Sequence, residues 1–224
     1  MGAPVPSGCA RGIRFVVDVW KPPSLGPVGR RAACEVVSLD LAAELLAHRI
    51  LFVGSGIDEE AARRLVTGLL GMNAANPSAP IELYINSAGG SVLDGLAIYD
   101  TMQLIRAPVA TYCLGCAASM GAVLLAAGTP GMRHATPNAR IMIHQVSTAF
   151  GVSGSTETVR VLNDVMASLN RAVAEILSRH TGQSLRRIRS DMRRTRWFTA
   201  EEARKYGIVD VVLSPKEERK GGGL

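Results

Sequence analysis

The sequence places a serine at the junction between a predicted strand and a predicted buried helix. Ser119 lies in the segment Gly115-Cys-Ala-Ala-Ser-Met-Gly-Ala. A serine near the start of a helix can expose its hydroxyl group while backbone N–H groups and the helix dipole face a developing negative charge. Ser119 is therefore a candidate nucleophile. The alternative is that a small residue is needed here only for close helix packing.

A candidate base is His144, which follows the short apolar strand Ile141-Met-Ile. Catalytic groups of open α/β sheets tend to emerge at the ends of strands, and a histidine there can take the proton of a nucleophilic serine. The alternative is a histidine whose ring nitrogens are satisfied in the core or at a sheet edge. His48, His134 and His180 have weaker contexts, because they lie in two polar helix ends and a loop.

A glycine pair lies in Asn86-Ser-Ala-Gly-Gly-Ser-Val, directly after a predicted strand and before a predicted helix. Paired glycines allow a tight turn with exposed backbone N–H groups. Such a turn can serve as an oxyanion hole or an anion-binding nest, or it can be an ordinary connection between a strand and a helix. It is not a phosphate-binding loop of the Gly-Lys-Ser/Thr type, because no such triplet follows.

Composition narrows the classes of function. Of the 224 residues, 47% are hydrophobic and 4% aromatic, so we expect a globular chain with a core of Ala, Val, Leu, Ile and Met.

Cys113 and Cys116 have CxxC spacing, but no second pair and no nearby histidine supports a metal or redox site. These cysteines favour a reducing, cytoplasmic compartment. We find neither an apolar stretch of membrane-helix length nor a signal-peptide layout.

The formal net charge of +6 raises the question of nucleic-acid binding. The densest basic run extends from Arg186 to Arg196 and contains one acid, Asp191. No DNA- or RNA-binding motif accompanies this run. We therefore expect a solvated or subunit-facing basic surface and no nucleic-acid partner.

The pattern of apolar residues predicts repeated strand-helix units, which implies an α/β domain with a largely parallel sheet. The expected segments are strands at 50–53, 80–85, 109–114, 141–143 and 208–213, and helices at 58–72, 91–105, 117–127 and about 155–180, with a short helix that opens at the capping box 199–202 and ends at Gly207. The Pro- and Gly-rich residues 1–37 and the polar tail 215–224 are expected to be an N-terminal extension or propeptide and a loose tail.

Several of these segments together resemble the proteolytic subunit of the ATP-dependent Clp protease. They are YINSAGGSV, AIYDTMQ, GCAASMGAVLLAAG, PNARIMIHQ, HTGQSL and TAEEARKYGIVD. The match runs from about Leu39 to Leu213, and the serine and histidine motifs have the family's order and separation. The resemblance implies a ClpP/crotonase-like α/β fold of repeated β-β-α units. The peptidase domain would span 38–214, and its protruding handle, at about 146–180, would interlock two stacked heptameric rings.

The resemblance also implies roles for single residues. Ser119 would attack the peptide carbonyl, His144 would move its proton, and the N–H groups of Gly90 and Met120 would hold the oxyanion. Tyr84 falls where the family has an aromatic residue of the cleft that docks a hexameric ATPase. That ATPase would unfold protein substrates and feed them in. The peptidase itself needs no cofactor, because the partner uses the ATP.

The sequence departs from the family pattern at the third catalytic position. Where the family has an Arg-Asp pair after the HTGQ segment, this chain has Arg194-Thr195. Thr195 carries no negative charge, and loss of that carboxylate in a serine protease can cost about 10⁴ in kcat. Asp191, one helical turn earlier, is a possible substitute. Asp191 and Thr195 therefore leave open which residue, if any, orients His144.

The neighbouring departure concerns contact between rings. The family has an acid before the arginine, whereas this chain has Arg193-Arg194. Two like rings would place arginine against arginine, so we expect a preference for a ring of a different, acidic paralogue. Ala88 also replaces the usual proline of the glycine turn, and residues 146–155 differ from the usual handle loop.

Three functions follow from these observations. The first is a working serine endopeptidase subunit that cleaves unfolded proteins to short peptides inside a ring chamber. The second is a catalytically weak or silent structural subunit of a mixed complex, which Thr195 and Arg193 favour. The third is a crotonase-like acyl-CoA enzyme, which shares the fold but is opposed by the Ser119 and His144 motifs.

Overall fold

The computed structural model describes residues 41–147 and 154–213. The extension predicted at 1–37 and the tail at 215–224 lie outside this part of the chain. The elements are, in order, α1 (Leu41–Ala47), β1 (Ile50–Val53), α2 (Glu59–Ala75), β2 (Ile81–Ser87), α3 (Val92–Leu104), β3 (Val109–Ala118), α4 (Met120–Ala126), β4 (Arg133–Ala135), β5 (Arg140–Ile143), α5 (Thr156–Thr181), α6 (Leu185–Arg193), β6 (Arg196–Thr199), α7 (Ala200–Tyr206) and β7 (Val211–Val212).

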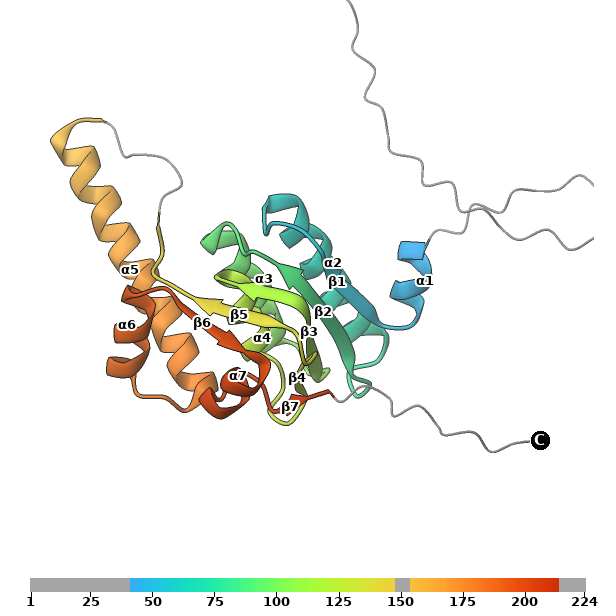
Figure 1. Cartoon of the computed structure of the whole chain (residues 1–224). Coiled ribbons are helices and arrows are strands. Elements are labelled where there is room, and N and C mark those ends of the chain that lie inside the picture. The colour runs from blue at the N-terminus through green and yellow to red at the C-terminus, as the bar shows by residue number, and fades with distance from the viewer. Residues whose placement is uncertain (1–40, 148–153, 214–224) are drawn as a thin grey trace, which may run out of the picture. The chain divides into compact units, whose positions relative to one another are not determined.

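The strands form one sheet that is parallel except at one edge (Figure 1). Its main order is β1-β2-β3-β4-β7, and every neighbouring pair in that order is parallel. β3 is the longest strand, and beyond β4 its last residues pair with β5. β6 then adds to β5 in the antiparallel direction. The predicted α/β fold with a largely parallel sheet is thus confirmed.

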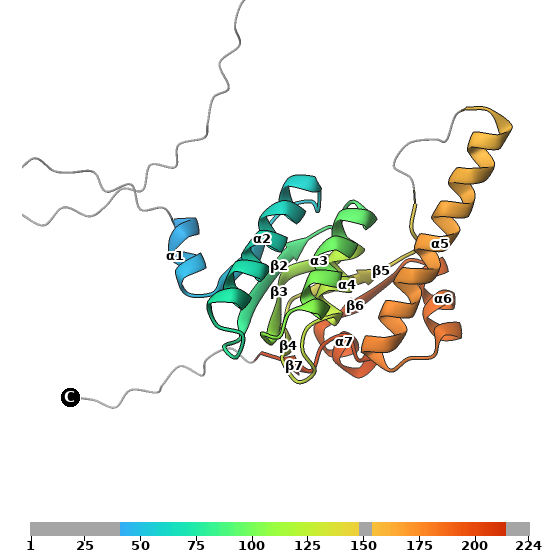
Figure 2. The same cartoon turned by 180° about the vertical axis from the view of Figure 1, so that it is seen from behind.

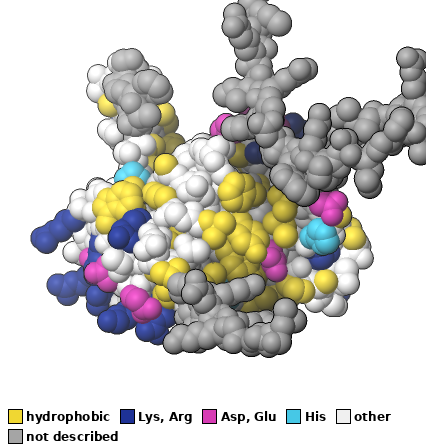
Figure 3. Space-filling model, turned by 45° about the vertical axis from the view of Figure 1, so that its right-hand side comes forward, with side chains coloured by type: hydrophobic (Ala, Val, Ile, Leu, Met, Phe, Trp, Pro, Cys, Tyr) yellow, Lys and Arg dark blue, Asp and Glu magenta, His cyan; other side chains and the backbone are white. Residues whose placement is uncertain are grey.

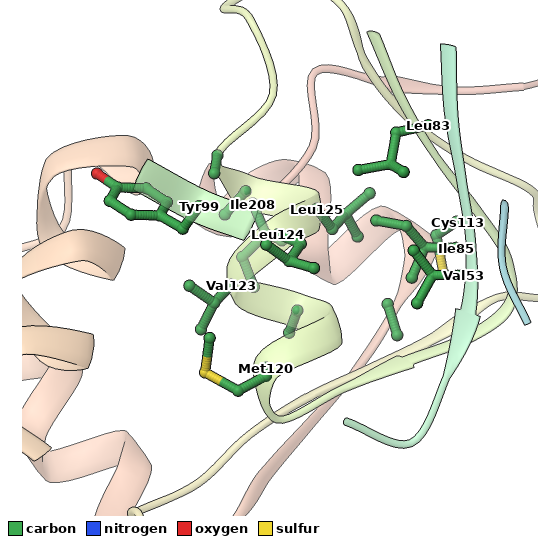
Figure 4. Close-up of a cluster of buried hydrophobic side chains, with 14 of the residues drawn as sticks. Val53, Leu83, Ile85, Tyr99, Cys113, Met120, Val123, Leu124, Leu125 and Ile208 are labelled. Carbon is green, nitrogen blue, oxygen red and sulfur yellow. The ribbon is translucent and has the colours of Figure 1, made fainter. Parts of the chain in front are cut away.

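Helices α2, α3 and α4 pack on one face of the sheet, as the view from behind shows (Figure 2). Every residue of α4 is buried, as its uninterrupted apolar sequence predicts. Its side chains Met120, Leu124 and Leu125 lie in the same cluster as Leu83 and Ile85 of β2 (Figure 4). This core consists almost entirely of Ala, Val, Leu, Ile and Met side chains, as the composition predicts.

The expected boundary between β3 and α4 was wrong by three residues. The Ala-rich segment was expected to be helical from Ala117, but Ala117 and Ala118 continue β3. The physical reason is tertiary pairing, because these two residues align with Ile141 and Met142 of β5. Alanine has high intrinsic helix propensity, and here strand pairing overrides it. Ser119 therefore stands directly between a strand and a helix.

Other differences lie near the C-terminus. The strand expected at 208–213 is only the two-residue β7. The arginine run expected as a basic surface forms α6, with Ser184 as its N-cap. Arg133 and His134, expected in a loop, belong to β4. The capping box at Thr199 and Glu202 and the left-handed C-cap at Gly207 are present as predicted.

The predicted handle is the 26-residue helix α5, which projects from the body beside α6 (Figures 1 and 2). Its N-cap is Ser155 and its last residue is Thr181, one residue later than expected, with Gly182 as the C-cap. Residues 148–153 of the expected handle loop lie outside the described part of the chain. None of the helices in the described ranges combines the length and the apolar character needed to cross a membrane.

Candidate active site

Ser119 occupies a backbone conformation that leaves its hydroxyl group free. Its φ of 55° and ψ of −122° are rare for a residue with a side chain. Serine at an N-cap usually accepts a hydrogen bond from the helix it starts, but Ser119 makes no such bond to α4. Its backbone N–H instead donates to the carbonyl of Met142 on β5, at 2.9 Å. The helix start is thus fixed by main-chain contacts, and the side chain is available for chemistry.

His144 reaches that free hydroxyl. The two atoms Nε2 of His144 and Oγ of Ser119 lie 2.9 Å apart. The contact follows from the sheet, because β3 and β5 are parallel neighbours with Ala118 aligned to Met142. Ser119 and His144 therefore leave the sheet at the same edge. At this distance His144 can accept the serine proton, which is the geometry of an activated nucleophile.

The glycine turn 88–90 lies against the serine. A Cβ atom on Gly89 would be 2.6 Å from the Cβ of Ser119 and 3.1 Å from the backbone nitrogen of Met120. Gly90 forms a bridge with Ile57, whose backbone would clash with a side chain at Gly90. Only a glycine pair allows this approach.

Two backbone donors remain free at this turn. Within residues 41–147 and 154–213, neither the N–H of Gly90 nor that of Met120 has a hydrogen-bond acceptor. Both residues line the same pocket as Ser119 and His144. Unpaired N–H groups beside a nucleophile are the donors that an oxyanion requires.

The pocket beside this pair has a volume of about 620 Å³ and a mostly apolar wall. Its lining residues come from α3, α4, β5, α5 and the segments that follow β2, β3 and β5, and none is acidic, lysine or arginine. The apolar members are Val92, Leu93, Met120, Val123, Met142, Ile143, Val146, Met166, Leu169, Val173 and Leu177. A pocket of this kind accepts an uncharged apolar side chain. Sequence reasoning did not find this pocket, because its residues are scattered over four elements.

Thr195 lies next to the end of the antiparallel pair formed by β5 and β6. The last aligned residues of that pair are Ile143 and Arg196, which His144 follows and Thr195 precedes in the chain. Thr195 has a left-handed φ of 50°, which is a genuine outlier for a β-branched residue. Within the described ranges the structure shows no hydrogen bond between the Thr195 side chain and His144. Thr195 is thus a neutral and strained residue next to the end of the β5–β6 pair.

Asp191, considered above as a substitute catalytic acid, is bound to other residues. It accepts a hydrogen bond from the hydroxyl of Tyr206 at 2.7 Å and forms an ion pair with Arg196 at 2.7 Å. Partial burial opposes its ionisation, but these hydrogen bonds outweigh burial and lower the pKa of Asp191. The carboxylate therefore joins α6 to β6 and α7, and in the described residues it makes no bond to His144.

Tyr84 lies in an aromatic row on the sheet face that α2, α3 and α4 leave open. Its ring stacks on Tyr112 at 4.6 Å, and Tyr112 stacks on His134 at 4.5 Å. Phe52 is aligned with Tyr84 on β1 and is 47% exposed. Hydrophobic side chains gather over the middle of this face (Figure 3). We call Phe52, Tyr84, Tyr112 and His134 the aromatic row.

Arg193 ends α6, and Arg194 is its C-cap; both are exposed. Neither side chain forms an ion pair with the described residues. Among the described residues, Cys113 and Cys116 are free cysteines. Burial raises the pKa of the Cys113 thiol to about 12, and no group of three or more His, Cys, Asp or Glu side chains in the described part could hold a metal ion.

A serine activated by a histidine, with free main-chain donors and an apolar pocket, defines the class of protein as a serine hydrolase on a ClpP/crotonase-like α/β fold. The comparisons specify the family. A model of the Clp protease family matches residues 33–216. The chain therefore belongs to the Clp protease family, as a serine-peptidase-type proteolytic subunit.

Relatives in three bacterial strains carry the name "ATP-dependent Clp protease proteolytic subunit 2". The protein of Corynebacterium efficiens is 46% identical over 178 residues, which cover 80% of this chain and 88% of the relative. That of Rhodococcus jostii is 45% identical over 179 residues, or 80% and 91% of the two chains. That of Corynebacterium diphtheriae is 48% identical over 169 residues, or 75% and 84%.

Proposed function

We propose that Ser119 and His144 form the catalytic pair with which this subunit cleaves unfolded polypeptides. The single observation that carries this proposal is the 2.9 Å contact between His144 Nε2 and a serine hydroxyl that is not used for helix capping. A serine with this backbone conformation and this partner has no evident structural role. The crotonase-like alternative is not supported, because acyl-CoA chemistry of that fold does not call for a serine-histidine pair.

The proposed reaction proceeds in two halves. Oγ of Ser119 bonds to the peptide carbonyl carbon as its proton passes to His144 Nε2, and the carbonyl oxygen becomes an oxyanion between the N–H groups of Gly90 and Met120. When the C–N bond breaks, His144 gives that proton to the leaving amine. A water molecule then repeats the sequence on the acyl-enzyme, releases the carboxylic acid and restores Ser119.

The apolar pocket gives the expected preference at the cleaved residue. Three methionines, Met120, Met142 and Met166, contribute to its wall. Methionine side chains are unbranched and adaptable, so an unbranched or γ-branched apolar residue should fit. An acidic residue would be desolvated there without a partner, at a cost of several kcal/mol.

The test is hydrolysis of fluorogenic peptides that differ only in having Met or Asp before the scissile bond. The Met peptide should have the higher kcat/KM by at least about 100-fold, and Ser119→Ala should remove hydrolysis of both. Equal rates for the two peptides, or activity that persists in Ser119→Ala, would refute the assignment of the pocket or of the nucleophile.

A second candidate function is that of a weak or silent structural subunit in a mixed complex. One observation favours it: Thr195, which precedes the residue aligned with Ile143, is uncharged. In that case an active paralogue would supply the turnover, and this chain would contribute assembly or gating. Mixing the chain with such a paralogue and comparing Ser119→Ala with the unmodified chain separates the two functions, since only a working subunit makes the mixture depend on Ser119.

The proposed partners follow the family, whose subunits form oligomeric rings and work with Clp ATPases. The aromatic row around Tyr84 is a partly exposed surface of stacked rings that suits docking of a hexameric ATPase. Residues Arg193 and Arg194 would lie at the contact between rings. We propose that hydrolysis needs no cofactor or metal in this chain, that ATP is used by the partner, and that the protein works in the cytoplasm.

A further inference from the structure

The ring of His144 is held from one side only. Within residues 41–147 and 154–213, its side chain makes one hydrogen bond, that of Nε2 with Ser119. A catalytic histidine usually has a second partner at Nδ1, which fixes the tautomer and the orientation of the imidazole. β5 ends at Ile143, directly before His144. The orientation of this ring therefore depends on how the main chain around it is held.

In the described part of the chain, two hydrogen bonds hold the main chain after His144. The N–H of Gln145 donates to the carbonyl of Met192 at 3.1 Å, and the N–H of Val146 donates to Oδ1 of Asn170 at 3.1 Å. The first acceptor belongs to the main chain, so any residue at position 192 would supply it. The second is a side chain of α5, so it depends on the residue type at position 170.

Asn170 is a half-buried polar residue on the packed face of α5. It shares this face with residues that line the catalytic pocket at helical spacing, namely Met166, Val173 and Leu177. Asparagine is a poorer helix former than leucine or methionine, and a polar group in a packed interface needs a hydrogen-bond partner. Among the described residues its one partner is Val146. An apolar residue would satisfy the packing, so the bond to Val146 is what asparagine adds.

Val146 connects this bond to the catalytic histidine. It lines the catalytic pocket and packs partly against the hydrophobic core. On the other side of His144, Ile143 is fixed by its pairing with Arg196. His144 thus lies within a span of three residues between two fixed points, and a shift at Val146 must move its backbone. A misplacement of about 1 Å in an active site can cost about 10² in rate.

We propose that Asn170 is a positioning residue for His144. By accepting the hydrogen bond of the Val146 N–H, it holds the segment in which the imidazole reaches Ser119. It thereby gives the ring part of the orientation that a bonded third residue gives in other serine proteases. Asn170 itself makes no bond to Ser119 or His144 in the described residues. The proposal rests on the function proposed above, because it concerns the same catalytic pair.

The test compares Asn170→Leu with Asn170→Asp in the full chain. Leucine has a similar size but no acceptor, whereas aspartate keeps an oxygen that can accept the N–H of Val146. We expect Asn170→Leu to lower kcat for peptide hydrolysis by about 10- to 100-fold while KM changes less than about threefold. Asn170→Asp should keep kcat within about threefold of the unmodified chain. A residue needed only for packing would not be rescued by the charged variant.

Amide hydrogen exchange gives a second measurement that needs no turnover. Exchange at Val146, followed by mass spectrometry of overlapping peptides, requires its hydrogen bond to open. We expect this exchange to be at least about tenfold faster in Asn170→Leu than in the unmodified chain, and to change less than about threefold in Asn170→Asp.

The matched control is Asn163→Leu, the same substitution on the same helix. Asn163 is exposed, and its side chain makes no hydrogen bond within the described ranges. This variant should change neither kcat nor the exchange at Val146. Circular dichroism and sedimentation establish that each variant folds and assembles as the unmodified chain does. If Asn170→Leu does not, Asn170→Ala replaces it, since alanine also lacks the acceptor and favours a helix.

Four results would overturn the proposal: an unchanged kcat in Asn170→Leu, an equal loss in Asn170→Leu and Asn170→Asp, a raised KM with kcat unchanged, or unchanged exchange at Val146 in Asn170→Leu. A failure of the proposed function reads differently. In that case the unmodified chain hydrolyses no peptide, alone or with an active paralogue, and the catalytic effect of Asn170 is refuted with it, although the exchange at Val146 still responds as expected.

Discussion

Thr195, which directly precedes β6, is the residue that we propose for the third catalytic position. Its left-handed φ of 50° costs a β-branched residue roughly 1–2 kcal/mol. Asp and Asn tolerate this conformation better because their short polar side chains bond locally. Threonine at this position therefore carries no negative charge and adds backbone strain. These two effects can be separated by substitution.

We predict that Thr195→Asp raises kcat for peptide hydrolysis by at least tenfold, with a ceiling of about 10⁴. The carboxylate would hold the His144 tautomer and stabilise the imidazolium. Thr195→Asn is the matched control, because it relieves the same strain without the charge and should give no comparable gain. Steady-state kinetics on the two variants decide the matter. Equal rates for Asp and Asn would mean that no carboxylate is used at this position.

Gly89 is the residue that brings the glycine turn against the nucleophile. Gly89→Ala places a methyl group 2.6 Å from the Cβ of Ser119 and 2.8 Å from the carbonyl of Ala118, at a φ of 94°. The turn must move, and we expect kcat to fall by about 10² or more, as when an oxyanion donor is lost. Gly71→Ala is the control, since nothing lies within 4 Å of the added Cβ in α2. A Gly89→Ala variant as active as Gly71→Ala would remove the turn from the mechanism.

Single residues of the candidate site could be predicted where the sequence pattern around them has one physical cause. Ser119 and His144 each followed an apolar strand, and adjacent parallel strands end at one edge, so the proximity of the two side chains could be anticipated. The unusual φ of Ser119 could not be anticipated, because it depends on the hydrogen bond that the N–H of Ser119 donates to the carbonyl of Met142. Likewise, no sequence rule predicts that Asp191 binds Tyr206 and Arg196, because these residues belong to different elements that come together only when the chain folds.

At the scale of elements, the long amphipathic and the capped helices were the most predictable. α5 and α7 carry their own boundary signals, at Ser155 and Gly182 and at Thr199 and Gly207. The elements that were missed lack such signals or are very short. β6 has four residues, and its strand state comes from pairing with β5. α6 is so rich in arginine that only Ile188 and Met192 mark its buried face.

The C-terminal end of α5 is held by a buried polar network. The side chain of Arg133 donates to the carboxylate of Asp210 and to the carbonyls of His180 and Gly207. Nε2 of His180 lies within hydrogen-bond distance of the hydroxyl oxygen of Tyr99, at 3.1 Å. Burial, and then the charges of Arg133 and Arg179, lower the pKa of His180. The neutral imidazole is therefore the form that the folded chain prefers.

This network predicts a pH dependence of stability. Because the pKa of His180 is lower in the folded state, the unfolded chain takes up the proton first, and stability falls as pH drops below about 6.5. Arg133 lowers the pKa of Asp210. The contribution of this carboxylate to stability therefore persists above about pH 4 and is lost only at lower pH. The urea concentration at the midpoint of unfolding of the unmodified chain should therefore decrease as the pH is lowered from 7.5 to 5.5.

His180→Gln isolates the histidine, since glutamine keeps a hydrogen-bond partner for Tyr99 but does not titrate. Its urea midpoint should change much less over the same range. His48→Gln is the control at an exposed histidine and should retain the decline. The explanation fails if His180→Gln and His48→Gln lose stability equally between pH 7.5 and 5.5.

At the scale of the whole molecule, the functional surfaces lie on different sides of the sheet. The aromatic row is on the open face, while Ser119 and His144 lie at the strand ends beside α5. A substitution in the row should therefore leave the chemistry intact. We predict that Tyr84→Ala, which removes a ring stacked on Tyr112, lowers ATPase-dependent protein degradation at least tenfold while small-peptide hydrolysis changes less than twofold.

The comparison for that prediction is Phe52→Tyr, which keeps an aromatic ring at the neighbouring position. It should preserve both activities. Degradation and peptide hydrolysis that fall together in Tyr84→Ala would indicate a damaged fold instead of a lost docking contact, and unchanged degradation would move the docking site elsewhere.

The central claim is that Ser119 is a nucleophile activated by His144. Reaction of the purified full-length chain with a fluorophosphonate, read by intact mass and peptide mapping, tests it most directly. The account predicts one covalent adduct on Ser119, no adduct in Ser119→Ala, and labelling slowed by at least about 10² in His144→Ala. The absence of any adduct, both alone and with an active paralogue, would contradict the claim and leave the structural subunit as the function.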